Sequence, residues 1–230
     1  MSNQTTTMTK DQERKAQVAS LIGATIEYYD YFLYGILASI VFNKLFFPTF
    51  DPIVGLLLSL ASFGIPYFMR PLGSVYFGHI GDKEGRRKAL MITLVLMGIA
   101  TVGIGVLPVY DTIGVWAPIL LVGLRLIQGF AVGGEWGGAV LVASENTEES
   151  SKAFGASIAL VGASLGMFLG TITVSLLTLM PNEAFMSYGW RLPFIGSIVL
   201  IIFGYWMRVG LEESEEFQEI QEEEETVKIP

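Results

Sequence analysis

The chain has 230 residues, of which 52% are hydrophobic and 16% are charged, against about 25% charged in an ordinary soluble domain. Ten of its 36 charged residues lie in residues 211–230 and five in residues 1–17, so the 193 residues between them carry only 21. A soluble core of that size needs far more polar cover, which excludes a water-soluble globular domain. The apolar composition also excludes a disordered chain, and the lack of Cys excludes a disulfide-stapled one.

The net charge of −8 belongs to one end of the chain. Residues 211–230 hold nine Glu and one Lys, whereas the other 210 residues hold 13 charges of each sign. Nucleic-acid binding requires a basic patch, so no nucleic-acid partner is expected. The sequence has one His and no Walker A loop, so we expect no metal site, no cofactor and no enzymatic activity.

Six segments are apolar enough to cross a bilayer, whose hydrocarbon core requires about 20 mostly apolar residues per helix. They are residues 18–47, 53–77, 89–107, 113–143, 153–180 and 192–209. The connections between them are short, and no soluble domain is inserted. We therefore predict an all-α, polytopic membrane protein, with a six-helix transmembrane bundle over residues 18–210 between a tail at 1–17 and an acidic tail at 211–230.

The distribution of Lys and Arg between the loops predicts the orientation of this bundle. With the N-terminus in the cytoplasm, the outer side receives only Lys44 and Arg191. The inner side receives ten cations: Lys10, Arg14, Lys15, Lys83, Arg86, Arg87, Lys88, Lys152, Arg208 and Lys228. We therefore expect a multi-pass protein of the plasma (cytoplasmic) membrane, surrounded by lipid, with both termini in the cytoplasm.

Charged residues inside a membrane are costly and are candidates for function. Glu27 and Asp30 lie three residues apart in the first segment and share a helix face, with Tyr34 on much the same face. Two carboxyl groups in a low-dielectric interior suit proton uptake and release. Two alternatives stay open: Glu27 pairs with a buried Arg, or both carboxylates lie near the cytoplasmic end in water.

Arg70 lies within the second segment. Because Arg stays protonated in proteins, it requires either an acidic partner or an anionic substrate. A substrate anion and an ion pair with Asp30 or Glu27 both fit the sequence. Pro71 follows Arg70 and is expected to open the helix locally.

The fourth segment carries three further polar candidates. Arg125 and Gln128 share one face, and Glu135 is ten residues after Arg125, about 80° round a helix, so all three can look toward an interior cavity. Glycines also repeat at every fourth position, a pattern that lets helices pack closely, and we expect packing rather than binding from them. These are Gly129, Gly133 and Gly137 here, and Gly162, Gly166 and Gly170 in the fifth segment.

The loop after the second segment contains Gly78, Asp82, Gly85, Arg86 and Arg87. Its charge alone is explained as a basic loop that fixes topology. The five residues also match, position by position, the pattern G-x-x-x-D-x-x-G-R-[RK]. The loop therefore resembles the conserved cytoplasmic loop of the major facilitator superfamily.

Further motifs extend this resemblance. The superfamily pattern R-x-x-Q-G of the fourth helix is matched by Arg125, Gln128 and Gly129. The stretches ATIEYYDYFLYG, FMRPLGSVYFGHIGD, RLIQGFAVGGEWGGAVLVASE and YGWRLPF resemble the metabolite:proton symporter family, which includes shikimate, α-ketoglutarate, citrate and proline/betaine transporters. The resemblance runs from about residue 16 to residue 217.

The resemblance implies secondary active transport, in which a small organic acid or zwitterionic metabolite crosses with a proton as the coupling ion while two six-helix halves rock about a central site. It implies that Asp82 steadies one conformation by engaging the other half, with Arg86 and Arg87 in the same charge cluster. It associates Arg125 with proton coupling. It also brings further residues within reach of substrate or proton: Glu27, Asp30, Tyr34, Gln128 and Glu135.

One departure from the superfamily concerns length. Its members have about twelve helices, whereas this chain has six predicted segments and stops at Pro230, inside what resembles the linker between the halves. We therefore expect either a truncated or split product, or a chain that pairs with a second six-helix half. Two other hypotheses stay open: a non-transporting sensor or assembly partner whose acidic tail binds a partner, and the remnant of an interrupted transporter gene.

Overall fold

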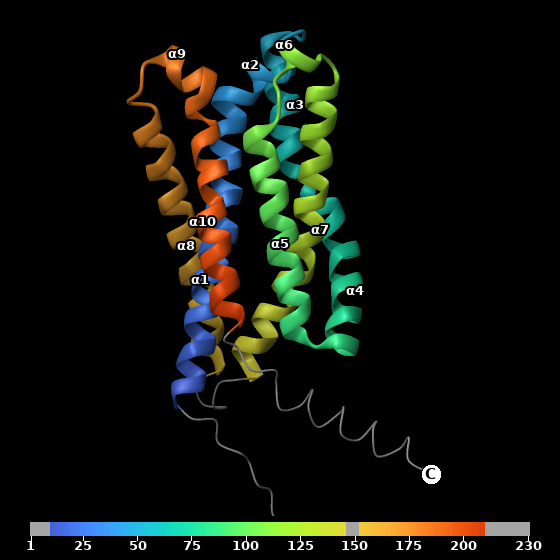
Figure 1. The fold of residues 1–230 in the computed structure, drawn as a ribbon, viewed down its shortest axis with the longest axis vertical. Helices are drawn as coiled ribbons and strands as arrows, with labels where there is room; N and C mark the ends of the chain where they lie inside the picture. Colours follow the sequence, from blue (N-terminus) through green and yellow to red (C-terminus); the bar gives the residue numbers. More distant parts are fainter. Residues whose placement is uncertain (1–9, 146–151, 210–230) are drawn as a thin grey trace, which may run out of the picture.

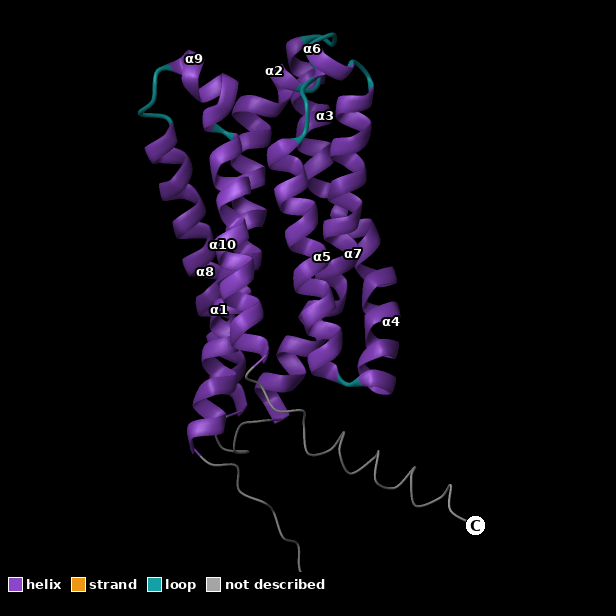
Figure 2. Cartoon of the chain, in the orientation of Figure 1, coloured by secondary structure: helices purple, strands orange, loops and turns teal. Residues whose placement is uncertain are grey.

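The computed structural model describes residues 10–145 and 152–209 of the chain (Figure 1). Within these ranges every regular element is a helix, and short loops connect the helices (Figure 2). This confirms the predicted all-α class. The acidic tail predicted at 211–230 and the first nine residues of the N-terminal tail lie outside the described residues.

The helices follow the predicted spans in order. The first span is α1 (Lys10–Leu37), which continues through a π-helical turn, η1 (Ala38–Phe42), into α2 (Asn43–Leu45). The second is α3 (Pro52–Gly64) followed by α4 (Pro66–Glu84), and the third is α5 (Arg86–Val106). The short α6 (Tyr110–Ile113) precedes the fourth, α7 (Trp116–Glu145), and the fifth is α8 (Lys152–Leu177). A short helix α9 (Asn182–Ala184) and a π-helical turn η2 (Phe185–Gly189) lead into the sixth, α10 (Arg191–Val209).

Most of these spans are long and apolar enough to cross a membrane. Four qualify singly, Pro52–Glu84, Arg87–Val106, Trp116–Gly134 and Leu160–Leu177, and a fifth is the pair Asn182–Gly189 and Arg191–Trp206, bent by 45°. Among the described residues α1 does not qualify, because Glu27, Asp30 and four Tyr side chains lower its hydropathy. The membrane crossing of α1 therefore stays a prediction.

The second span contains a one-residue turn at Ile65, where α3 ends and α4 begins. The missing N–H of Pro66 accounts for a helix start at that position. Pro71 lies inside α4, and the local opening expected there stays a prediction. Arg70 consequently lies in the second turn of a helix that starts beside the bundle interior.

The spans pack mainly in four pairs: α1 along α8, α4 along α7, and α5 along both α10 and α7. Figure 1 shows α1, α8 and α10 on one side of the bundle and α4, α5 and α7 on the other. The helix α5 therefore joins the two sides, because it packs on α7 within its own side and on α10 of the other side.

Glycines allow α7 to approach α4 until their backbones touch. A Cβ atom added at Gly129 would lie 2.2 Å from the Pro66 carbonyl oxygen, and one at Gly133 would lie 2.1 Å from that of Arg70. The second stripe does the same for α8 on α1, where a Cβ at Gly162 or Gly166 would lie within 2.6 Å of an α1 carbonyl oxygen. These contacts confirm the packing interpretation for the described glycines. They also fix the start of α4, and with it Arg70, against α7.

The upper end of the bundle in Figure 1 is held by buried aromatic side chains and by Arg191. Arg191 Nη1 donates to the carbonyl oxygens of Gly105 at 2.8 Å and Leu107 at 2.7 Å, which satisfies acceptors left unpaired at the C-terminal end of α5. This contact locks α10 to α5 just above the polar interior. Ring-to-ring contacts join Tyr34, Phe42, Phe46, Trp190 and Phe194, and Phe47 and Phe185 are buried in the same cluster.

Candidate functional site

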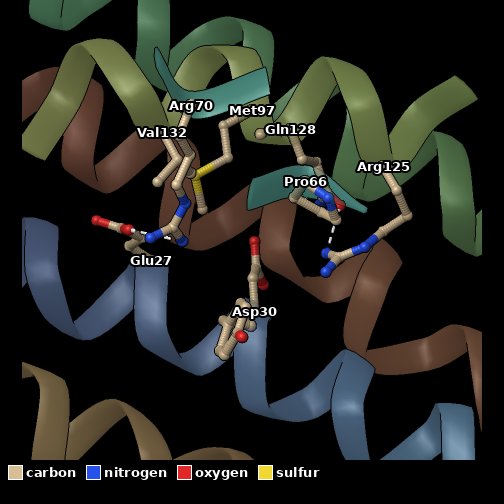
Figure 3. Close-up of a pocket in the computed structure, with 10 residues that line it drawn as sticks. Glu27, Asp30, Pro66, Arg70, Met97, Arg125, Gln128 and Val132 are labelled. Atoms are coloured by element: carbon tan, nitrogen blue, oxygen red, sulfur yellow. Dashed lines mark hydrogen bonds and ion pairs between the residues drawn. The ribbon is translucent and has the colours of Figure 1, made fainter. Parts of the chain in front are cut away.

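A pocket opens in the middle of the bundle, between α1, α4, α5 and α7 (Figure 3). The space between its side chains, together with the open region at its mouth, is roughly 310 Å³. Five of the predicted site residues line it together: Glu27, Asp30, Arg70, Arg125 and Gln128. Its other lining residues are Tyr31, Pro66, Met97, Gly129 and Val132.

Asp30 is a buried carboxylate that is hydrogen-bonded through both of its oxygens. Its side chain is 3% exposed, and both of its oxygens accept hydrogen bonds. Thr101 Oγ1 on α5 donates to Oδ2 at 3.0 Å, and Ser197 Oγ on α10 donates to Oδ1 at 2.9 Å. Three helices therefore meet at this carboxylate, which needs such donors because a buried ionised group is costly without them.

A chain of side-chain hydrogen bonds connects Asp30 with Arg125. Arg125 Nη1 donates to Gln128 Oε1 at 2.8 Å, and Gln128 Nε2 donates to Thr101 Oγ1 at 2.8 Å. Thr101 in turn donates to Asp30. The Arg125 cation and the Asp30 carboxylate are thus connected through two neutral side chains. The direction of the bonds is fixed, because Arg can only donate, whereas Gln has an acceptor oxygen and a donor NH₂ group.

Arg125 is embedded in the bundle. It is 3% exposed, its Nη2 donates to the Phe63 carbonyl oxygen at 3.0 Å, and its Nε lies 3.4 Å from that of Ser62. Its guanidinium carbon lies 3.9 Å from the centre of the Tyr34 ring, a cation–π contact. Tyr34 therefore packs behind Arg125, away from the pocket wall, with its hydroxyl 2.6 Å from Ser62 Oγ.

Arg70 is bound much more loosely than Arg125. Its nearest carboxylate is Glu27, at 3.9 Å between Nη2 and Oε1, and its side chain is 28% exposed. Its guanidinium carbon lies 4.4 Å from the centre of the Tyr67 ring and 5.9 Å from that of Tyr31. Its Nε is buried without a hydrogen-bond partner among the described residues. Arg70, which lines the pocket (Figure 3), thus keeps one donor, Nε, without an acceptor among the described residues.

Two tyrosine hydroxyls meet next to Arg70. The hydroxyl oxygens of Tyr31 on α1 and Tyr67 on α4 are 2.6 Å apart. Their rings are 6.0 Å apart at an interplanar angle of 88°. Together with Arg70 they form a polar and aromatic rim, which offers both hydrogen-bond donors and apolar ring surface.

The segment predicted as a loop after the second span is helical at both ends, at the end of the bundle where α4 meets α5 (Figure 1). Gly78 and Asp82 lie in α4, Arg86 and Arg87 lie in α5, and only Gly85 separates the two helices. Gly85 has φ of 100°, a conformation that favours glycine, which explains why the motif has Gly there. Asp82 and Gly78 are exposed, and a Cβ at Gly78 would meet nothing within 4 Å. Lys88 forms an ion pair with Glu84, which ties the first turn of α5 to the last turn of α4.

Some predicted site residues are not described in full. The backbones of Glu135 and Arg86 lie in α7 and α5, but their side chains lie outside the described part of the structure. Arg87 is partly exposed and takes part in an interaction of its own. Within the described residues, no group of three or more His, Asp or Glu side chains is placed to hold a metal ion.

The sequence did not point to Thr101 and Ser197. Both are buried and both donate to Asp30, yet single Ser and Thr residues are ordinary in transmembrane helices. The sequence also did not point to Tyr67 as a contact of Arg70, because an aromatic residue in a membrane helix is as readily explained by packing. Only the position of these residues opposite Asp30 and Arg70 distinguishes them.

A family model described as "Sugar (and other) transporter" matches residues 15–228. The chain belongs to this family, within the major facilitator superfamily. Its relatives are membrane transport proteins, and the chain is accordingly a membrane protein of a transporter family rather than an enzyme.

Among similar proteins, the shikimate transporter of Escherichia coli K12 is 51% identical over 216 residues, which cover 94% of this chain and 49% of the relative. The inner membrane metabolite transport protein YhjE of the same organism is 47% identical, over 98% of this chain and 53% of the relative. The proline/betaine transporter of that organism is 43% identical, over 90% and 41%. The chain thus spans about half the length of these relatives.

The fold is shared with solved transporter structures. The xylose transporter XylE from E. coli, in a partially occluded inward-open conformation, superposes with a TM-score of 0.78 at 18% identity, over 91% of this chain and 52% of that one. At this identity the likeness concerns the fold. It agrees with the helical architecture predicted from the motifs.

Proposed function

We propose that the chain forms the N-terminal half of a secondary active transporter that carries a small organic acid together with a proton by alternating access. The observation that carries this proposal is the shared pocket, in which Asp30 and Glu27 lie with a partly exposed cation, Arg70, whose Nε has no hydrogen-bond partner among the described residues. Membership of a transporter family supports it. The name of the shikimate transporter indicates an organic acid as the first solute to test.

Arg70 is the proposed binding group for the solute's carboxylate. Arg125 is the other candidate, but its guanidinium already faces three acceptors and the Tyr34 ring and has almost no exposure. Arg70 is partly exposed to the pocket and holds Glu27 only at 3.9 Å. A carboxylate can therefore approach Arg70 with charge-assisted hydrogen bonds and rearrange only one loose ion pair.

The same geometry favours an acid over a quaternary ammonium solute. An ammonium group would bind best on aromatic faces, but the Tyr67 face at the pocket rim already carries the guanidinium of Arg70 at 4.4 Å. Like charges would then be adjacent in a medium of low dielectric. A zwitterionic metabolite remains compatible, because its carboxylate can bind Arg70 while its cationic end points toward Glu27.

Coupling to the proton is proposed to occur at the two α1 carboxylates. A solute carboxylate on Arg70 competes with Glu27 for the same guanidinium. Asp30 lies one helical turn further along the same wall and is the second proton-binding candidate. Protonation of either group keeps the net charge of the loaded pocket low, which a membrane interior requires.

Transport is proposed to require a complementary six-helix half, to which Asp82 at the exposed end of α4 presents its carboxylate. The orientation proposed has the α4–α5 junction in the cytoplasm. Lys83, Arg87 and Lys88 lie at that end, whereas Lys44 and Arg191 lie at the opposite one. This grouping fits the preference of cationic residues for the cytoplasmic side.

The proposal is tested by co-reconstituting the chain in liposomes with the C-terminal half of the E. coli shikimate transporter. An inwardly directed pH gradient should drive uptake of labelled shikimate, and unlabelled glycine betaine should not compete. Asp30→Asn or Glu27→Gln should abolish the dependence on the pH gradient while solute exchange continues. Uptake that ignores the gradient, or that persists unchanged in both variants, would remove the carboxylates from the mechanism. Uptake by the chain alone would remove the need for a second half.

A further inference from the structure

The hydroxyl of Ser197 has two acceptors and one hydrogen. Its Oγ lies 2.9 Å from Asp30 Oδ1 and 3.0 Å from the Pro193 carbonyl oxygen, one turn earlier in α10. A serine hydroxyl carries a single hydrogen, so it can donate to only one of them at a time, and it can also accept. Ser197 is 1% exposed, so no bulk water replaces either bond.

We propose that Ser197 is the positioning residue for the coupling proton, and that the proton is held on Asp30 Oδ1. With Asp30 ionised, the Ser197 hydroxyl donates to Oδ1. When a proton from the aqueous pathway binds Oδ1, the new O–H donates to Ser197 Oγ, and the serine hydrogen rotates to the Pro193 carbonyl. No covalent bond breaks in the serine, and both protonation states stay fully hydrogen-bonded. This inference rests on the proposed proton-coupled function.

The opposite oxygen of Asp30 is unsuited to the proton. Gln128 Oε1 faces Arg125 Nη1, which can only donate, so the Gln128 amide must donate to Thr101 Oγ1. Thr101 then has one hydrogen, and Asp30 Oδ2 is its acceptor in the structure. A proton on Oδ2 would point at the Thr101 hydroxyl hydrogen, and two hydrogens would then face each other without an acceptor. Oδ2 is therefore held as an acceptor in both states, and Oδ1 is the oxygen whose partner can reverse.

The charged groups around Asp30 do not change this assignment. Arg125 from α7 is connected to Asp30 through the uncharged side chains of Gln128 and Thr101, whether or not Asp30 is protonated. Arg70 from α4 and Glu27 from α1 line the same pocket. Tyr29 on α1 forms a side-chain hydrogen bond with Thr173 of α8 and also interacts electrostatically with the Asp30 carboxyl group as a whole. The charged residues of α5, α8 and α10 lie only near their helix ends: Arg86, Arg87, Lys88, Lys152, Arg191 and Arg208.

The experiment follows the carboxylic acid C=O stretching band by infrared spectroscopy during a pH titration of the full chain in lipid vesicles. Asp30→Asn identifies the band by removing it. Ser197→Ala should change the proton affinity of Asp30 about tenfold, because a hydrogen bond to the ionised carboxylate is about twice as strong as the neutral one lost from the acid. Ser197→Thr, which keeps the hydroxyl, should restore the wild-type midpoint.

Ser59→Ala is the matched control. Ser59 is also fully buried, but its hydroxyl donates only to the Ala38 carbonyl oxygen at 2.6 Å, so its loss should leave the titration unchanged. A Ser197→Ala midpoint equal to that of Ser59→Ala, or a Ser197→Thr midpoint equal to that of Ser197→Ala, would overturn the inference. If Ser197→Ala does not fold, Ser197→Cys, whose thiol is a weaker donor, should shift the midpoint part of the way, and an unchanged midpoint would again overturn it.

The titration and the uptake assay separate the two proposals. A Ser197-dependent band without gradient-driven uptake would refute symport and leave the proton position standing. Gradient-driven uptake with a band that ignores Ser197 would refute the proton position alone.

Discussion

The contact between α7 and α4 gives the sharpest test of how packing positions the site. Gly133→Ala adds one methyl carbon to α7, which would lie 2.1 Å from the Arg70 carbonyl oxygen. Side-chain Cβ atoms essentially never approach a heavy atom closer than 3.0 Å, so α4 must move away by at least 0.9 Å. Arg70 belongs to that backbone, so its guanidinium moves with it.

The expected cost follows from two opposing effects. Overpacking a closely packed interior costs about 1–3 kcal/mol, and replacing Gly in a helix by Ala returns about 0.5–1 kcal/mol. The net loss of up to about 2.5 kcal/mol corresponds to a fall in melting temperature of up to roughly 10 °C for a chain of this size. Gly123→Ala is the matched control on the same helix, because a Cβ there meets nothing within 4 Å; its melting temperature should rise by roughly 1–4 °C.

Thermal unfolding of both variants in one detergent, followed by circular dichroism, measures this difference. The same samples, assembled with the second half, report the Michaelis constant for solute uptake, which should rise only in Gly133→Ala. Equal melting temperatures for the two variants would refute the claim that α7 touches the α4 backbone. A lower melting temperature with unchanged uptake would show instead that Arg70 does not bind solute.

Three further predictions concern the site and the loop. Arg70→Gln should raise the Michaelis constant for an organic acid about 10–100-fold, because it removes a hydrogen bond to a charged group worth about 1.5–3 kcal/mol; a constant within twofold of wild type would contradict the role of Arg70. Arg125→Lys should lower the free energy of unfolding by about 3 kcal/mol, because an ammonium cannot reach Gln128, Phe63 and Ser62 together; Arg70→Lys, as its control, should cost far less. Gly85→Ala should cost about 1–3 kcal/mol because of its φ of 100°, whereas Gly78→Ala should be harmless, and thermal melting of the two variants compares them.

The sequence was sufficient for the class, the order of the spans and most of their limits. Hydropathy locates a membrane helix because the bilayer imposes a minimum apolar length, and the predicted starts at 89, 153 and 192 fall within three residues of α5, α8 and α10. The same measure fails for α1, whose charged and Tyr-rich face is buried in the bundle. It also gave no sign of the turn at Ile65 that separates α3 from α4.

For the candidate site, too, the sequence predicted some features and not others. Helical periodicity predicted that Glu27 and Asp30 share a face, as do Arg125 and Gln128, because neighbours on one helix are fixed by local geometry. Which helix faces which is decided by packing, and Asp30 receives its two donors from residues 71 and 167 positions away. The loose pairing of Arg70 and the enclosed position of Arg125 likewise follow from where α4 and α7 meet. Sequence therefore determined which polar groups enter the membrane, and tertiary structure decided which of them are already satisfied and which remain available to a solute or a proton.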